Sequence, residues 1–486
     1  MSRYAVFTVM MLWAAAAPGR ADEAAIIADI GEFIRTDDTA RRTELVARIQ
    51  ADPAYDRARV SEWLHAAEVF EPLKPGPLEL AVPLPDGSTR TVVLRIPQDY
   101  DCHRAWPVIY ALHGMSGHAT NSLAYFQRAL GADVEQYVLA APDGYADQVI
   151  SETQWPPTGE HPAALLKIKQ TVNVDSDRVY VAGYSMGGHT SWTLAVLYAD
   201  QFAGAVPLAG TFTIILPDHL HETFLPNLAH LPVLGVWGAG DTKDARGDES
   251  RGGGIAGSNR GLRELGAKLG LQLTMIELSD RGHSDVDPPA DALRALLAQR
   301  RVPYPRAVHH VFRHLCQGSA YWLEAHAWSG EQWTDQKKTV HLREGENLFK
   351  DEDLDAAVAR HYRGMLAELS GEIDGQNIRV LHKKVSDLTV WIGDGLIDWD
   401  QPVSLKAGGR PPVELQVQPD LYVCLAQAAR TRDFDRLRWA GIRVRPSAGK
   451  PYLVTSKTTF PAPFSKPRQA APAKDKPKTR AGPKKG

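Results

Sequence analysis

The chain has 486 residues, of which 44% are hydrophobic and 23% charged, and its formal net charge is −3. This composition is that of an ordinary globular protein, and the length allows two domains with full-sized cores. A disulfide-rich scaffold is excluded, because Cys102, Cys316 and Cys424 can form one bridge at most. Their spacing also indicates no metal–thiolate site.

The first residues have the parts of a secretory signal. Arg3 precedes an apolar stretch that ends at Ala17, and Gly19 and Ala21 place small residues where a signal peptidase reads the chain. The apolar stretch is shorter than the ~20 residues that a membrane span needs. We therefore expect residues 1–21 to be a signal peptide cleaved after Ala21, and the protein to be exported to the periplasm or the extracellular space.

The next segments predict a helical stretch and then an α/β domain. Residues 22–75 carry three stretches with helical spacing of apolar residues, which predict a helical N-terminal segment. From residue 76 two apolar runs flank an Asp-Gly turn and predict a β-hairpin. Further strand candidates alternate with helical stretches, at 107–114, 137–144, 178–185, 205–210, 232–238 and 273–279. This alternation predicts an eight-stranded, mostly parallel sheet with helices on both faces, over residues 76–302.

The remaining residues predict a second domain and a tail. Residues 303–464 hold short strands joined by turn signals and predict a smaller antiparallel β domain, with one helix near DLYVCLAQAARTRDF. In this region AVHHVFRHLC favours a strand paired with SAYWLEAHAW over a zinc-binding helix face. Residues 465–486 carry six Lys and two Arg against one Asp. They predict a disordered basic tail, either simply solvated or in electrostatic contact with an anionic cell envelope.

The most informative stretch is RVYVAGYSMGGHTSW, residues 178–192. A predicted strand precedes Ser185, and a helix with an apolar face is predicted to follow it. A serine on so sharp a strand-to-helix turn needs neighbours without side chains, and Gly183 and Gly187 flank it. The pattern predicts a nucleophile elbow, which exposes the hydroxyl above the sheet.

A nucleophilic serine needs a base, and the base needs a group that orients it. In this architecture both follow the serine in chain order, on loops after later strands. Asp241 follows PVLGVWG and His283 follows LTMIELS, so we predict His283 as the base and Asp241 as the orienting acid. Asp244 is the alternative acid. His189 lies one helical turn past Ser185 and is predicted to be structural, because its side chain would point into the packing.

A place for the developing oxyanion is predicted at LHGMSG, residues 112–117. This stretch leaves a core strand with two glycines around Met115. The backbone N–H groups of Met115 and of Met186, the residue after the nucleophile, are the predicted donors. The alternative is that Gly114 and Gly117 merely close a turn.

The motif Gly-Tyr-Ser-Met-Gly-Gly, with LHG upstream and GAGD and GH downstream, resembles the α/β-hydrolase fold. Among its branches the chain is most similar to the secreted esterases that include polyhydroxyalkanoate depolymerases and feruloyl esterases. It is also similar to dienelactone-hydrolase-like esterases, to carboxylesterases and to the catalytic domain of prolyl-oligopeptidase-type peptidases. The resemblance covers roughly residues 76–302 and departs from the simple pattern in the helical segment before it and the β domain after it.

The resemblance implies an exported serine hydrolase that cleaves carboxylic esters through an acyl-enzyme on Ser185. The implied substrate is a small-molecule or polysaccharide ester, for example of a sugar, a phenolic acid or a small lipid. A serine peptidase of prolyl-oligopeptidase type and an inactive hydrolase-fold binding protein of the cell envelope are the alternatives. No metal, organic cofactor or nucleic acid is expected as a partner.

Some further signals bear on the substrate pocket and on cofactors. Residues 155–157 and 211–226 follow strand ends and are candidates to line the acyl or alcohol pocket, with simple loop packing as the alternative for Trp155. The glycine run at 252–257 matches a dinucleotide fingerprint but does not leave a strand directly, so we expect a flexible loop there. Four aromatic residues of the β domain favour core packing over a carbohydrate-binding face: Tyr321, Trp322, Trp328 and Trp333.

Overall fold

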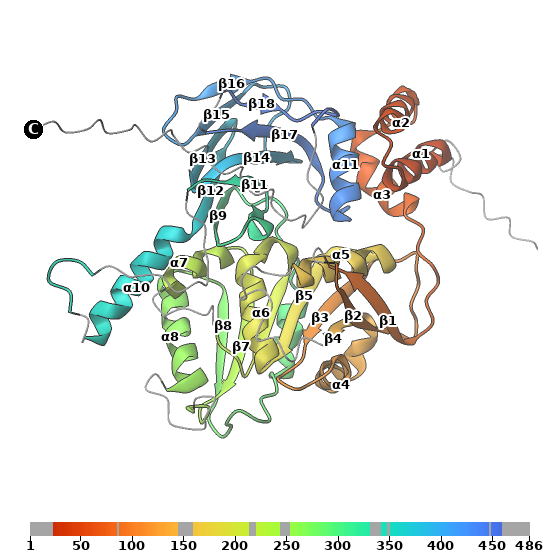
Figure 1. Ribbon diagram of the computed structural model, residues 1–486. Helices are drawn as coiled ribbons and strands as arrows, with labels where there is room; N and C mark the ends of the chain where they lie inside the picture. The colour runs from red at the N-terminus through yellow and green to blue at the C-terminus, as the bar shows by residue number, and fades with distance from the viewer. Residues whose placement is uncertain are drawn as a thin grey trace, which may run out of the picture.

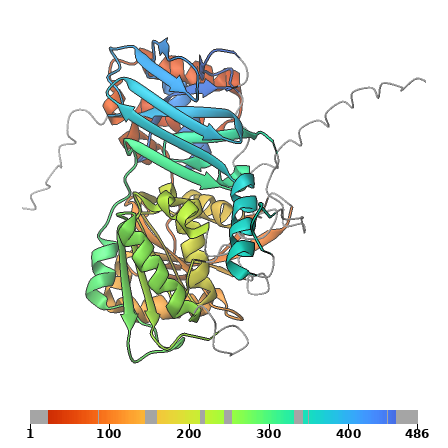
Figure 2. The same ribbon diagram turned by 90° about the vertical axis from the view of Figure 1, so that its left-hand side faces the viewer.

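The computed structural model describes residues 23–84, 87–143, 159–212, 220–243, 253–330, 342–347, 350–446 and 449–458. The expected signal peptide and basic tail lie outside these ranges. Figure 1 shows an α/β domain below a β-rich domain, with the N-terminal helices beside the latter, and Figure 2 shows the same arrangement from the side. In the described part of the chain, no helix has both the length and the apolar character needed to span a bilayer.

The α/β domain is built on one eight-stranded sheet, as the sequence predicts. Its strands are β1 (Gly76–Pro83), β2 (Thr89–Ile96), β3 (Trp106–Leu112), β4 (Val138–Asp143), β5 (Val174–Tyr184), β6 (Gly204–Leu208), β7 (Val233–Gly238) and β8 (Leu273–Leu278). Their order in space is β1-β2-β4-β3-β5-β6-β7-β8. The β1–β2 and β2–β4 pairs are antiparallel, and all other neighbours in this sheet are parallel. The predicted fold class is therefore confirmed.

Helices cover both faces of this sheet, because its strands are apolar on both sides. The helices are α4 (Ala119–Leu130), α5 (Glu160–Thr171), α6 (Met186–Leu197), the short α7 (His221–Phe224), α8 (Gly254–Lys268) and α9 (Ala290–Leu297). Strand β3 shows the reason: Val108 and Tyr110 lie in the core shared with α5 and α6, whereas Ile109 and Ala111 lie in the core shared with α4 and α9. Alternate side chains of one strand thus pack into two separate layers.

The C-terminal β domain contains two five-stranded sheets that enclose a second core. One sheet has the order β10 (Ser319–Ala320), β11 (Leu323–Trp328), β14 (Val385–Gly393), β17 (Arg438–Val444), β18 (Tyr452–Leu453). The other has the order β16 (Val413–Leu415), β15 (Val403–Ala407), β13 (Asn377–Lys383), β12 (Ala367–Asp374), β9 (Ala307–Phe312). All pairs are antiparallel except β13 with β15. Helices α10 (Asp351–Met365) and α11 (Leu421–Thr431) belong to the described part of this domain.

The structure corrects some expectations for this domain. Strand β9 does pair, but with β12 rather than with SAYWLEAHAW, because a 3₁₀ turn at Leu315–Gln317 directs the chain into the other sheet. The predicted helix near DLYVCLAQAARTRDF is confirmed as α11, whereas α10 has no counterpart in the sequence analysis. The three cysteines form no disulfide with one another.

The N-terminal helices pack on the C-terminal β domain. Helices α1 (Ala24–Arg35), α2 (Thr39–Ala51) and α3 (Val60–Ala67) share an apolar core with α11 and β17. Phe33 of α1, for example, meets the Tyr422 ring of α11 edge-to-face, with 5.4 Å between ring centroids. The chain therefore starts in one unit, builds the α/β domain, and returns to the first unit (Figure 1).

Buried ion pairs join the two units at the amino ends of the parallel strands. Arg301, just after α9, lies 2.7 Å from the Asp433 carboxylate and 2.9 Å from that of Asp177 near the start of β5. Arg436 lies 2.7 Å from Asp200, just ahead of β6. The side chains of Arg301, Asp433, Arg436 and Asp200 are each at most 3% exposed. The β domain thus covers the amino edge of the α/β sheet.

We expect Asp433→Ala to lower the free energy of unfolding by about 3–5 kcal/mol, because it removes one of the two carboxylate partners of the buried Arg301 guanidinium and leaves it only Asp177. The measurement is urea unfolding followed by circular dichroism. Glu372→Ala is the matched control, since the Glu372–Arg379 pair is at least 60% exposed on both sides and should change stability by about 1 kcal/mol or less. Equal effects of the two substitutions would contradict the role given to the buried network.

Candidate active site

Ser185 sits in a strained turn between β5 and α6, with φ 57° and ψ −117°. This positive φ is rare for a residue with a side chain. The flanking glycines make the turn possible: a Cβ on Gly183 would lie 2.4 Å from the Gly187 carbonyl oxygen. A Cβ on Gly187 would lie 2.2 Å from the carbonyl oxygen of Leu112 in β3. Both glycines are therefore required by close backbone contact.

Ser185, His283 and Asp241 form one hydrogen-bonded row. The Ser185 hydroxyl lies 2.8 Å from His283 Nε2, and His283 Nδ1 lies 2.7 Å from an Asp241 carboxylate oxygen. Because an ionised carboxylate can only accept, Nδ1 carries the proton and donates to Asp241, which leaves Nε2 free to accept from the serine hydroxyl. Asp241 is buried, whereas the His283 side chain is 45% exposed. The row is thus anchored inside and reachable from solvent at the Ser185–His283 end.

The loops that carry Asp241 and His283 are joined through their backbones. A Cβ on Gly238, the last residue of β7, would lie 2.1 Å from the Gly282 carbonyl oxygen. The Gly240 N–H donates to the carbonyl of Arg281 over 2.9 Å. Both glycines belong to the GAGD motif that ends at Asp241, but only the fold shows the backbone contacts that require them.

Hydrogen bonding to Asp241 raises the pKa of His283 above its ordinary value of 6.5. His189, the other histidine near the nucleophile, has its pKa lowered by burial. The Nδ1 atom of His189 lies 2.7 Å from the carbonyl oxygen of Thr211, so His189 is hydrogen-bonded to the backbone rather than to Ser185. This agrees with the structural role predicted for it. Asp244, the alternative acid, lies outside the described residues.

The loop with Met115 passes directly beside the nucleophile. A Cβ on Gly114 would lie 3.5 Å from Ser185 Cβ, and the loop closes through a 3.0 Å bond from the Gly117 N–H to the Gly114 carbonyl. Met186 is the first residue of α6, where a backbone N–H has no partner within the helix. Both predicted oxyanion donors therefore belong to segments that adjoin Ser185.

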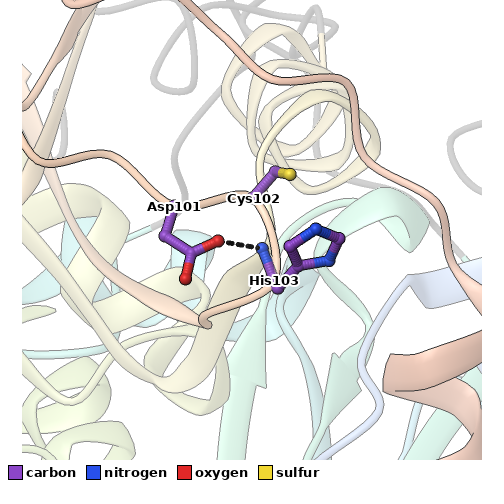
Figure 3. A group of neighbouring side chains, drawn as sticks. All are labelled: Asp101, Cys102 and His103. Atoms are coloured by element: carbon purple, nitrogen blue, oxygen red, sulfur yellow. Dashed lines mark hydrogen bonds between the residues drawn. The ribbon is translucent and has the colours of Figure 1, made fainter. Parts of the chain in front are cut away.

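In the described part of the chain, one group of side chains has the spacing to hold a metal ion: Asp101, Cys102 and His103 (Figure 3). Their ligand atoms lie within 4.8 Å of one another, but Asp101 already accepts from the His103 backbone N–H over 2.8 Å. The group lies on the turn before β3, at the opposite edge of the sheet from Ser185. A metal bound there would not reach the candidate active site.

Residues 155–157 and 213–219 lie outside the described ranges, so the lining of the substrate pocket stays a prediction. Tyr321 and Trp322 of the β domain are 3% and 1% exposed, which agrees with core packing. Trp333 lies outside the described residues.

Comparison with known proteins finds similarity within the α/β domain. Residues 86–250 match a family model described as "Putative esterase". The domain has the α/β-hydrolase fold, and its residues 86–250 are similar to esterases. The chain is 32% identical over 114 residues to poly(3-hydroxyalkanoate) depolymerase C of Paucimonas lemoignei, a match that covers 21% of this chain and 28% of that protein.

Two solved structures are similar to part of this chain at lower identity. A thermostable esterase is 20% identical with a TM-score of 0.36, and the match covers 46% of this chain and 63% of that one. Poly(aspartic acid) hydrolase-1 of Sphingomonas sp. KT-1 is 15% identical with a TM-score of 0.37, over 47% of this chain and 99% of that one. The chain thus spans just over a quarter of the depolymerase and under two thirds of the esterase.

We expect Gly187→Ala to lower the free energy of unfolding by about 1–3 kcal/mol, because the new methyl group would overlap the Leu112 carbonyl. Thermal and urea unfolding measure this. The same substitution at Gly261 in α8, where nothing lies within 4 Å of the added Cβ, should instead raise stability by about 0.5–1 kcal/mol. A neutral Gly187→Ala would contradict the close contact of α6 with β3.

We expect the His283 imidazole to titrate above pH 6.5, and Asp241→Asn to lower its pKa, because the carboxylate stabilises the charged imidazolium. Imidazole NMR signals followed against pH, with His283→Gln to identify the resonance, provide the measurement. Asp280→Asn is the control, since Asp280 is three residues away and its side chain is 75% exposed. A His283 pKa that is the same with and without the Asp241 carboxylate would contradict the assignment.

Proposed function

We propose that the protein is a serine hydrolase that cleaves carboxylic esters through an acyl-enzyme on Ser185. The observation that carries the proposal is the hydrogen-bonded row of Ser185, His283 and Asp241, with Ser185 on a strained turn after a parallel strand. The esterase match of residues 86–250 supports an ester as the substrate. The chain order serine, acid, histidine is that of α/β-hydrolase triads.

The first half of the reaction makes the acyl-enzyme. His283 Nε2 takes the Ser185 hydroxyl proton while Oγ forms a bond to the carbonyl carbon, and the carbonyl π electrons move onto its oxygen. We assign the Met115 and Met186 N–H groups to stabilise that oxyanion. One donor of this kind typically contributes about 3–4 kcal/mol to the transition state. The C–O bond to the leaving alcohol then breaks, and His283 gives its proton to the alcohol.

The second half releases the acid. Water attacks the acyl carbon while His283 accepts its proton, and His283 returns that proton to Ser185 Oγ as the acyl–serine bond breaks. Asp241 acts throughout by accepting the Nδ1 proton, which fixes the tautomer and stabilises the imidazolium. Each step uses only these side chains, backbone N–H groups and water.

We propose an exported enzyme that acts on an ester of a sugar, a phenolic acid or a small lipid. The partly exposed His283 side chain and the half-buried Ser185 make the reacting atoms reachable from solvent, which supports access of such an ester. Because the β domain packs on the amino edge of the sheet, we assign the pocket to loops of the α/β domain alone.

The test is a pair of initial rates on the purified protein, with a short p-nitrophenyl ester and an aminoacyl p-nitroanilide. We expect ester turnover without anilide turnover, and a loss of at least about 10³-fold in Ser185→Ala, because the acyl-enzyme needs the Ser185 hydroxyl. Clear anilide turnover, lost in Ser185→Ala, would make the protein a peptidase instead. Rates no higher than those of Ser185→Ala would overturn the hydrolase proposal and favour a binding protein.

A further inference from the structure

A side chain at the end of β5, the strand that leads to Ser185, holds the loop that carries His283, the proposed base. The hydroxyl of Tyr184, the residue directly before Ser185, donates a hydrogen bond to the backbone carbonyl of His283. Its ring also lies beside the His283 imidazole, with 6.0 Å between centroids. The end of β5 therefore leads directly to Ser185, and through the Tyr184 side chain it also holds the backbone of His283.

Little else along this loop is positioned by burial. Residues 283–285 are exposed, and Asp285 adopts φ 59°, which is unfavourable for a residue with a side chain. The loop is anchored again at Val286, which is fully buried and whose carbonyl accepts from the Tyr125 hydroxyl over 2.8 Å. Tyr125 lies on α4, with its ring centroid 5.6 Å from that of Tyr184. Two adjacent tyrosine hydroxyls therefore hold the loop by its backbone.

The Tyr184 hydroxyl can serve as a donor across the working pH range. Burial, together with the negative charges of Asp285, Asp241 and Asp287, raises the pKa of Tyr184 to about 12. The titratable groups around His283 itself are Asp241, which is hydrogen-bonded to it, and the more distant His189, whose pKa is lowered by burial. Arg128 faces the other side of the pair, over the Tyr125 ring and 3.8 Å from Asp287.

We propose that Tyr184 is a positioning residue for the hydrolase reaction, whose hydroxyl holds the His283 backbone so that the imidazole spans Ser185 and Asp241. This inference rests on the proposed function. It predicts that the hydroxyl contributes to turnover rather than to substrate binding, because Tyr184 acts on the base through the backbone. Small displacements of a catalytic group can cost on the order of 10²-fold in rate.

The test compares Tyr184→Phe with Tyr180→Phe on the same p-nitrophenyl ester. Tyr180 is the matched control, since it lies on β5 in the same core layer and its hydroxyl also donates to a backbone carbonyl, that of Leu297 over 2.6 Å. We expect Tyr184→Phe to lower kcat on the order of 10-fold to 10²-fold with little change in KM. We also expect the acid limb of its pH–rate profile to move to lower pH, because a looser bond to Asp241 lowers the pKa of the base.

Tyr180→Phe should lower thermal stability while kcat and the acid limb stay as in the unaltered protein. If Ser185→Ala is inactive and Tyr184→Phe keeps the original kcat and acid limb, the positioning role is overturned and the proposed function stands. If Ser185→Ala is as active as the unaltered protein, the proposed function itself fails. Should Tyr184→Phe not fold, Tyr125→Phe decides, with a change of kcat in the same direction expected and an unchanged kcat overturning the inference.

Discussion

The candidate active site depends on the direct approach of α6 to the backbone of β3. Because Gly187 has no side chain, its Cα can lie against the Leu112 carbonyl, and the helix begins immediately after Ser185. That contact brings the Gly114 loop beside the serine. A second close contact of this kind lies between Gly238 and the backbone of Gly282, and it brings the loops of Asp241 and His283 together. The absence of a Cβ at Gly187 and Gly238 therefore sets the distances between Ser185, His283, Asp241 and the oxyanion loop.

Charged residues have different roles at the two edges of the α/β sheet. At the amino edge, buried charges of both signs neutralise one another and join the two units. At the carboxyl edge, His283 is partly exposed and its pKa is governed chiefly by one buried carboxylate. Because the charge networks lie at opposite ends of the strands, the electrostatics of the site are set locally. A substitution in the charge network at the amino edge can therefore change the stability of the protein with little effect on the reactivity of the site.

The sequence predicts those parts of the structure whose signals are local. Continuous apolar strands, the glycine-flanked Ser185, and polar residues directly after two strand ends define the α/β sheet and bring out Asp241 and His283 as candidates. Contacts between distant segments leave no such local signal. The strand partner of β9 and the packing of α1 on α11 are of this kind. Tyr184 escaped notice because an aromatic residue at the end of a strand is typical of core packing, and only the fold shows the carbonyl that its hydroxyl meets.

The return of the chain to its starting unit affects how the protein is made. Helices α1 to α3 bury their apolar faces against α11 and β17, and Ser61 bonds the carbonyl of Phe434, 373 residues away. The α/β domain is thus an insertion within another domain, in topological terms. During synthesis the first helices emerge long before their partners and keep apolar surface uncovered for most of translation. The outer unit therefore cannot be completed until α11 and β17 have been made, and until then the apolar faces of α1 to α3 lack the partners that they have in the folded protein.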